Sequence, residues 1–132
     1  MEDLAKKLAA LHLQTRKALT VRDRTFGLKE AFLFNLLDAP KPTRELTDAL
    51  RMKKSNLALL AIKCEKEGLI QKLRTQTDGR LVRYALTESG EAYITGVLTE
   101  VEKKFATVLT DETQMNGGSE KIDLILELLS YL

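Results

Sequence analysis

Basic side chains are concentrated in the middle of the chain, where two arginines follow a tight-turn dipeptide. The turn signal Asp78-Gly79 is followed by Arg80 and Arg83. Residues 41–83 hold 11 Lys and Arg against 5 Asp and Glu, a balance of +6, whereas the chain after residue 83 holds 3 against 9, a balance of −6. In a chain of net charge +2, this asymmetry predicts a lobe that binds a polyanion. A solvated surface is the alternative for charge alone.

The sequence holds no pattern that is typical of a catalytic or metal centre. It contains no H-E-x-x-H, no Gly-rich phosphate loop and no nucleophile with a positioned base, so we expect no enzyme activity and no cofactor. His12 has no second His or Cys at metal-ligand spacing, which predicts a surface or dimer-contact residue and no metal site. Cys64 lies on the apolar side of a predicted helix, where a core thiol is favoured over a redox sensor.

Length and composition predict one folded domain over residues 1–132. The chain is 44% hydrophobic and 30% charged, which is ordinary for a folded protein, and it has no long Gly/Ser- or Pro-rich linker. No apolar run approaches the roughly 20 residues that cross a bilayer, and the start lacks the apolar stretch of a signal peptide. We therefore expect a cytoplasmic protein with no membrane partner. The lone cysteine cannot form an internal disulfide, which agrees with a reducing compartment.

Apolar residues at helical spacing predict two helices in the first 40 residues. A long first helix spans residues 1–26, because no proline or glycine interrupts it before Gly27. A second, more apolar helix spans residues 28–37. Pro40 and Pro42 end it, since proline lacks an amide hydrogen and disfavours helix in the residue before it.

Two short helices are predicted next. Thr43 offers an N-cap oxygen to a helix over residues 44–50. The following helix spans about 54–67, or begins at Ser55, and Gly68 stands where a left-handed C-terminal cap is wanted. Two short helices separated by a few residues are typical of a helix-turn-helix.

A β-hairpin is predicted after these helices. Residues 69–74 and 81–87 are strand-like and are joined by a turn over residues 75–80. On the second strand, Val82, Tyr84 and Leu86 share one face, which can cover the core. Arg83 lies on the other face and should stay exposed. Thr87 can then cap the next helix.

The end of the chain predicts two more helices. The first runs from Glu88 to about Thr110, longer than a small domain needs for its own packing. Asn116-Gly117-Gly118 is expected to break the chain, and Ser119 to cap a last helix rich in Leu and Ile. Such an apolar terminal helix should be buried against another chain. The first and last helices together predict an obligate homodimer.

The order and spacing of these pieces resemble the multiple-antibiotic-resistance (MarR) type of winged helix-turn-helix regulators. The most specific part runs from E-L-T-D-A-L at Glu45, through a helix that ends E-K-E-G-L-I, to D-G-R, a strand and L-T-E-S-G. Members of the family place a D-x-R element in the wing and end the next strand in L-T-x-x-G. This pattern is matched by Asp78, Arg80, Leu86, Thr87 and Gly90, with Asp78 expected to orient Arg80 or to shape the turn.

The resemblance implies a mainly α fold with a small β-hairpin wing, that is, an α+β winged helix-turn-helix. The DNA-binding lobe would span residues 41–87, and the dimerisation helices residues 1–26 and 88–132. The implied function is a transcriptional regulator, expected to be a repressor, that binds pseudo-palindromic double-stranded DNA as a homodimer. A small molecule bound between the dimer helices and the DNA lobe would act as an effector. The alternative is a winged-helix protein-interaction module without sequence-specific DNA binding.

The helix over about 54–67 has the two faces that entry into the major groove requires. Its core face is Leu57, Leu60, Ala61 and Cys64. On the other face, Asn56 suits an adenine edge and Leu59 only a thymine methyl. Arg80 would enter the minor groove at the wing tip. The complete set of predicted DNA contacts is Lys53, Lys54, Ser55, Asn56, Leu59, Lys63, Arg74, Arg80 and Arg83.

The predicted recognition helix departs from the family pattern at its centre. The family commonly has a small hydroxyl residue followed by Thr and Arg where Ala58 and Leu59 stand here. The helix is also apolar from Leu57 to Ile62. Weakly specific DNA binding and the protein-interaction alternative both fit this apolar run.

Overall fold

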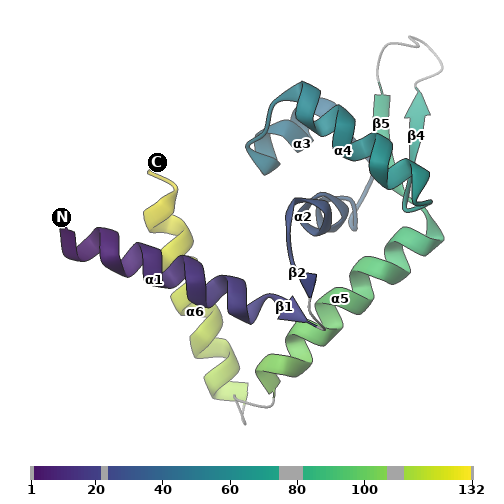
Figure 1. The fold of residues 1–132 in the computed structure, drawn as a ribbon. Helices are drawn as coiled ribbons and strands as arrows, with labels where there is room; N and C mark the ends of the chain where they lie inside the picture. The colour runs from purple at the N-terminus through teal and green to yellow at the C-terminus, as the bar shows by residue number, and fades with distance from the viewer. Residues whose placement is uncertain (1, 22–23, 75–81, 107–111, 132) are drawn as a thin grey trace.

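The computed structural model describes residues 2–21, 24–74, 82–106 and 112–131 (Figure 1). Within these ranges the elements follow one another in the order α1 (Glu2–Ala18), β1 (Thr20–Val21), β2 (Arg24–Thr25), α2 (Leu28–Asn35), β3 (Lys41–Pro42), α3 (Thr43–Leu50), α4 (Lys54–Lys66), β4 (Ile70–Arg74), β5 (Val82–Leu86), α5 (Glu88–Ala106) and α6 (Glu112–Leu129).

The first helix is shorter than predicted. The expectation of one helix to residue 26 is wrong, because α1 ends at Ala18 and the next residues form a small antiparallel hairpin with Thr20 opposite Thr25. A side chain that is distant in the sequence contacts the backbone where α1 ends. The ammonium of Lys104 in α5 donates hydrogen bonds to the carbonyl oxygens of Lys17, at 2.6 Å, and Thr20, at 2.9 Å. Carbonyls left unpaired where a helix stops need such partners.

A single apolar core lies between α2, α3, α4, the sheet and the start of α5. Phe32 and Leu33 on α2 are fully buried, and the Phe32 ring meets the Tyr84 ring edge-to-face with their centroids 6.0 Å apart. The α2 helix ends at Asn35, two residues before the predicted end. The core consists of Phe32, Leu33, Leu36, Leu46, Leu57, Ala61, Cys64, Leu69, Ile70, Tyr84 and Ile94.

The two helices of the helix-turn-helix form where they were expected, with different start signals. Thr43 is the first residue of α3 and not its cap, because Pro42 occupies the cap position and makes no side-chain hydrogen bond there. Lys53 likewise precedes α4 without a side-chain cap, so that this helix begins at Lys54. The end of α4 is as predicted, since Gly68 adopts a φ of 76°, in the left-handed region that glycine enters without steric cost.

The sheet has three strands in the order β3-β5-β4, all antiparallel. The two long strands agree with the predicted hairpin, whereas β3 was not predicted from its two residues. In the β3–β5 pair, Lys41 lies opposite Tyr84 and Pro42 opposite Arg83, which ties the start of α3 to the middle of the sheet. The predicted turn over 75–80, with Asp78-Gly79 and Arg80, lies outside the described residues.

The junction between the sheet and α5 is held by a cap that the sequence predicted. The hydroxyl oxygen of Thr87 accepts a hydrogen bond from the Gly90 N–H at 3.0 Å, and the hydroxyl donates to the Gly68 carbonyl at 2.6 Å. Gly90 is required here by a close approach, because a Cβ at this position would lie 1.9 Å from the Leu69 carbonyl oxygen. The start of α5 is therefore clamped to the strand that follows α4.

The last helix begins earlier than predicted. The expectations of a break at Asn116-Gly117-Gly118 and of a cap at Ser119 are wrong, since α6 is continuous from Glu112 to Leu129. Neither of these two glycines adopts a positive φ. A glycine in a helix costs only about 1 kcal/mol relative to alanine, so the helix that propagates from the leucine-rich end can include the pair.

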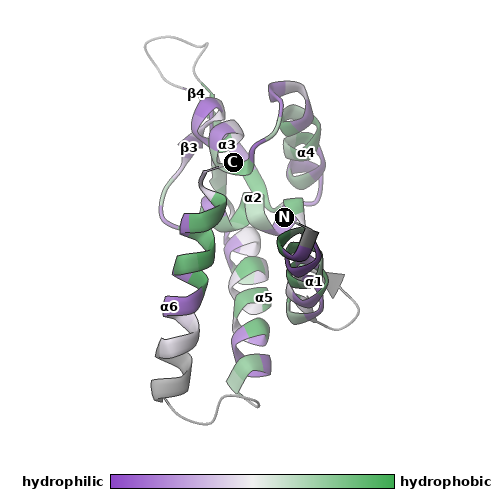
Figure 2. Cartoon of the chain, turned by 90° about the vertical axis from the view of Figure 1, so that its left-hand side faces the viewer, coloured by the Kyte–Doolittle hydropathy of each residue, from purple (hydrophilic) through white to green (hydrophobic). Residues whose placement is uncertain are grey.

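The helices α1 and α6 lie to one side of the core-containing part of the chain (Figure 1). Apolar residues dominate the final turns of α6, as the turned view in Figure 2 shows. Within the described residues, neither α1 nor α6 packs extensively on another element. Among the helices that the structure describes, none is long and apolar enough to cross a membrane.

Candidate nucleic-acid interface

The helix α4 has one face in the core and one face exposed. Leu57, Ala61 and Cys64 are fully buried, and Leu60 is half-buried, as predicted for the inward stripe. The opposite side chains are exposed and include six of the predicted DNA contacts, which are Lys53, Lys54, Ser55, Asn56, Leu59 and Lys63. The structure therefore places these six residues on the exposed side of α4 and at its first turn.

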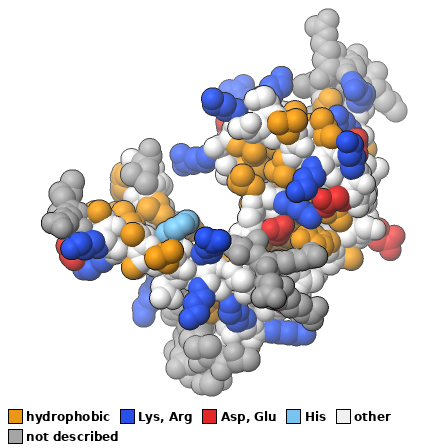
Figure 3. All heavy atoms as spheres, in the orientation of Figure 1, with side chains coloured by type: hydrophobic (Ala, Val, Ile, Leu, Met, Phe, Trp, Pro, Cys, Tyr) orange, Lys and Arg blue, Asp and Glu red, His pale blue; other side chains and the backbone are white. Residues whose placement is uncertain are grey.

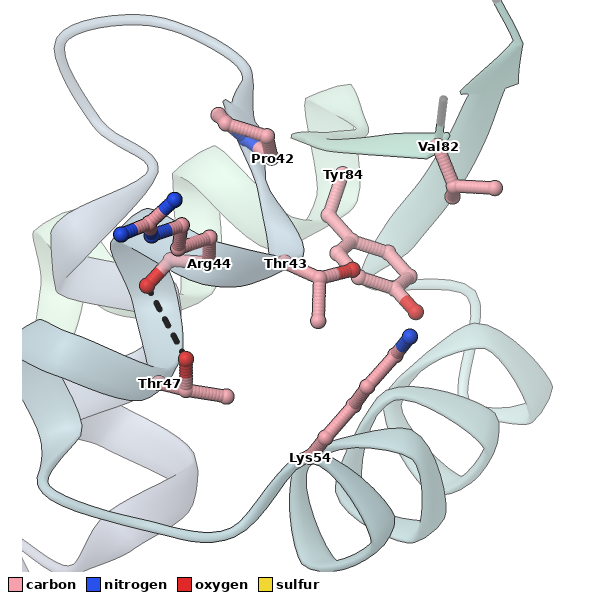
Figure 4. A pocket seen from close by; sticks show the side chains of 7 residues that line it. All are labelled: Pro42, Thr43, Arg44, Thr47, Lys54, Val82 and Tyr84. Atoms are coloured by element: carbon pink, nitrogen blue, oxygen red, sulfur yellow. Dashed lines mark hydrogen bonds between the residues drawn. The ribbon is translucent and has the colours of Figure 1, made fainter. Parts of the chain in front are cut away.

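An open pocket lies where α4 begins, between α3 and the sheet (Figure 4). The Lys54 side chain extends from α4 toward the hydroxyl of Tyr84, and Arg44 lies on the other side of the pocket (Figure 4). The Thr47 hydroxyl donates a hydrogen bond to the Arg44 carbonyl at 2.9 Å. The pocket, of about 500 Å³, is lined by Pro42, Thr43, Arg44, Thr47, Lys54, Val82 and Tyr84.

Sequence reasoning did not include Arg44 among the candidate contacts. Two features of the sequence could have indicated Arg44. It lies in the first turn of the first helix of the helix-turn-helix, and it belongs to the basic segment. Arg44 and Lys54 place two cations around one opening that also presents the hydroxyl groups of Thr43 and Tyr84. Cations and hydroxyl donors are the groups that bind phosphate oxygens.

The two strand arginines lie on opposite faces of the sheet. Arg74 is paired with Val82, and Arg83 with Leu73, so that successive side chains alternate between the faces. Val82 lines the pocket, and Arg74 therefore shares the face toward α4, whereas Arg83 is exposed on the other face. The two arginines thus do not form one surface patch. The third predicted arginine, Arg80 at the wing tip, lies outside the described residues.

The end of α4 is held by a cluster that sequence reasoning missed. The Lys29 ammonium on α2 lies 2.8 Å from the Glu67 carboxylate and 5.0 Å from the centre of the Tyr93 ring on α5. The hydrogen bond to Glu67 raises the pKa of Lys29. The Tyr93 hydroxyl lies 3.4 Å from the Glu30 carboxylate, to which it donates. These contacts connect the end of α4 with α2 and α5.

The positions of Cys64 and His12 agree with the predicted core thiol and the predicted helix-surface residue. Cys64 is completely buried, and burial raises the pKa of its thiol to about 11, as for a core residue. His12 is exposed on α1. Within the described ranges, no group of His, Cys, Asp and Glu side chains is placed to hold a metal ion.

The surface around α3 and α4 combines apolar and basic side chains. In Figure 3, hydrophobic atoms form the middle of this surface, with Lys and Arg side chains around much of it and Asp and Glu side chains on its lower side. The exposed apolar side chains of α4 include Leu59, which is 68% exposed, and Ile62, which is 43% exposed. Both side chains therefore face solvent and are not part of the core.

Several solved structures share this arrangement of elements. No protein-family model and no curated protein sequence matches the chain. A MarR-like transcriptional regulator from Thermotoga maritima is 28% identical, with a TM-score of 0.65 over 97% of this chain and 95% of that one. A mutant of MarR from E. coli, complexed with operator DNA, is 16% identical, with a TM-score of 0.71 over 94% of each chain.

A third structure is similar over nearly the whole chain. The PcaV transcriptional regulator from Streptomyces coelicolor, in complex with its natural ligand, is 19% identical, with a TM-score of 0.63 over 94% of this chain and 89% of that one. The chain therefore has the winged helix-turn-helix fold of the MarR-type regulators. This confirms the resemblance and the α+β fold class that were predicted from the sequence.

Proposed function

We propose that this chain is a DNA-binding transcriptional regulator that acts as a homodimer on pseudo-palindromic duplex DNA, with repression as the expected outcome. The observation that carries the proposal is the geometry of α4, a helix fixed by three fully buried side chains, whose exposed side carries Lys54, Lys63 and Lys66 beside polar and apolar side chains. A helix of this kind can enter the major groove while its neighbours contact phosphates. The fold supports the same function, since the similar structures are of transcriptional regulators and not of enzymes.

The proposed contacts divide by chemistry. Asn56 and Leu59 would meet base edges, with Ser55 beside them at the start of α4. Phosphate contacts would come from the cations around these residues. They are Lys53, Lys54, Lys63 and Arg74 from the predicted set, together with Arg44, and Arg83 on the far face of the sheet. Arg80 keeps its predicted place in the neighbouring minor groove.

A second copy of the chain is the proposed partner of α1 and α6. Leucine and isoleucine side chains on these helices are exposed, among them Leu13 at 64% and Leu124 at 65%. Contiguous apolar surface on terminal helices is typical of a subunit interface. Two α4 helices about 34 Å apart would then reach successive major grooves on one side of the duplex.

A small-molecule effector is part of the proposal. PcaV was crystallised with its natural ligand, and NadR, which is 23% identical to this chain, with 4-hydroxyphenylacetate. A ligand that binds between the dimer helices and the lobe would change the spacing of the two α4 helices and hence DNA affinity. The proposed function also places the protein in the cytoplasm, with the DNA.

The proposal is tested by the salt dependence of DNA binding. Duplexes selected from random sequence are titrated with the full chain by fluorescence anisotropy at several salt concentrations. If about 8 phosphates are neutralised per dimer, the plot of log K against log salt has a slope of about −7. Lys63→Ala, which is present twice in the dimer, should reduce the magnitude of this slope by about 2.

Lys103→Ala is the matched control, because Lys103 is an exposed lysine on α5. It should leave the slope unchanged. Absence of binding to any duplex at low salt would contradict the proposed function and favour the protein-interaction alternative.

A further inference from the structure

The side chains of α4 that point furthest from the core form a narrow line with an apolar middle. Successive residues of an α-helix are rotated by about 100°, so the direction opposite Leu57, Ala61 and Cys64 is occupied by Ser55, Leu59, Ile62 and Lys66. Leu59 and Ile62 are the central pair of this line, at 68% and 43% exposure. On a helix that enters a groove by this side, Leu59 and Ile62 are the apolar side chains that point toward the floor of the groove.

The surroundings of this pair indicate what covers it. Lys54 precedes the pair, and Lys63 and Lys66 follow it, all of them exposed. In Figure 3, Lys and Arg side chains lie around much of the apolar area, and Asp and Glu side chains lie on its lower side. A purely apolar partner would leave these cations without a counterpart. An anionic partner with apolar groups at the bottom of a groove would match both the lysines and the apolar pair. DNA is such a partner, because its major groove presents the C5 methyl group of thymine.

We propose that Leu59 and Ile62 determine specificity by packing against thymine methyl groups in each half-site, an inference that rests on the proposed DNA-binding function. Neither side chain can donate or accept a hydrogen bond. Each would therefore leave the edge of a G·C pair without a partner in the desolvated interface, which is unfavourable. An A·T pair also presents polar edge atoms, but its thymine adds a C5 methyl group, and apolar contact with this methyl offsets part of the cost. The preferred half-site then contains thymines where the middle of α4 meets the bases.

The experiment removes the methyl groups and leaves the hydrogen-bonding edges in place. The tightest duplex from the random selection is resynthesised with deoxyuridine in place of each thymine in turn, symmetrically in both half-sites, and affinity is measured by anisotropy. Loss of one methyl contact should weaken binding about fourfold for each half-site. Deoxyuridine outside the selected site should have no effect.

Variants of the protein connect the effect to the two side chains. Leu59→Ala should bind the selected duplex more weakly, lose the sensitivity to deoxyuridine at one position, and keep the salt dependence of the parent, because no phosphate contact changes. Alanine has the highest helix propensity, so α4 remains formed. Leu28→Ala is the matched control, since Leu28 is 57% exposed on α2, and it should bind like the parent.

The outcomes separate this inference from the proposed function. A chain that binds duplex DNA but does not respond to deoxyuridine overturns the role of Leu59 and Ile62 and leaves the regulator intact. A chain that binds no duplex at low salt overturns the proposed function and this inference with it. Leu59→Ala with unchanged DNA affinity and loss of binding to another protein would assign the apolar pair to a protein partner.

Discussion

The central lobe and the terminal helices use apolar residues in opposite ways. In the part of the chain that the structure describes, every buried hydrophobic residue lies between Phe32 and Ile94, whereas α1 and α6 contain none. The terminal helices instead expose Leu4, Leu13, Ile122, Leu124, Leu126 and Leu128. The lobe thus holds its own core, whereas the terminal helices leave these apolar side chains exposed in the single chain. Under the proposed function, fold stability and assembly would therefore depend on separate sets of apolar residues.

The largest expected effect comes from the core of the lobe. Phe32→Ala removes a fully buried ring and its edge-to-face contact with Tyr84. It should lower the free energy of unfolding by about 3 to 5 kcal/mol, measured by urea denaturation. Phe34→Ala on the same helix is the control, because Phe34 is 49% exposed and should change stability far less. Equal losses for the two variants would contradict the placement of the core.

A smaller effect is expected from the terminal helices, and it concerns assembly. Leu124 and Leu128 lie four residues apart on α6 and are 65% and 51% exposed. Replacing both with Glu would place unpaired charges in the proposed dimer interface and should weaken dimerisation about a hundredfold or more. Sedimentation should detect monomers at micromolar concentration, with the helical signal of the lobe retained.

The matched control for this pair is Glu120→Gln, which alters an exposed residue of the same helix. It should sediment like the parent. A double Glu variant that remains dimeric would show that α6 is not the interface and would remove the basis of the comparison between lobe and terminal helices.

The smallest expected effect is a pH dependence from Cys64. Burial raises the pKa of this thiol from 9.0 to about 11. Between these values the unfolded chain has released the proton and the folded chain retains it, so the free energy of unfolding should decrease as pH rises above about 9. Cys64→Ala should lack the part of this decrease that comes from the thiol. Urea denaturation of parent and variant at several pH values measures the difference. Parallel pH profiles would contradict the burial of the thiol.

Much of the central lobe was predictable because its signals are local. The two faces of α4 follow from helical spacing alone, and Gly68 and Thr87 are in the roles that their types favour at the ends of helices. Six of the nine predicted contact residues precede or belong to α4, and their common exposure follows from the same periodicity.

The wrong predictions concern features that distant residues or weak local preferences decide. The early end of α1 involves the Lys104 ammonium, 84 to 87 positions away from the carbonyls that it contacts. No local pattern indicates such a partner. The predicted break at the glycine pair in α6 was wrong for a different reason. Glycine lowers the stability of a helix without forbidding it, so the local signal was too weak to end α6.

The sequence by itself determined the order of the helices and of the two strands β4 and β5, the basic lobe and the two faces of α4, since each depends on residue type and short-range periodicity. Tertiary structure alone decided which of the basic residues share a surface. It joined Arg44 to Lys54 around one pocket and separated Arg74 from Arg83, because strand register and the docking of α3 against the sheet set these positions. Such relations arise from packing between distant segments, which no local pattern encodes.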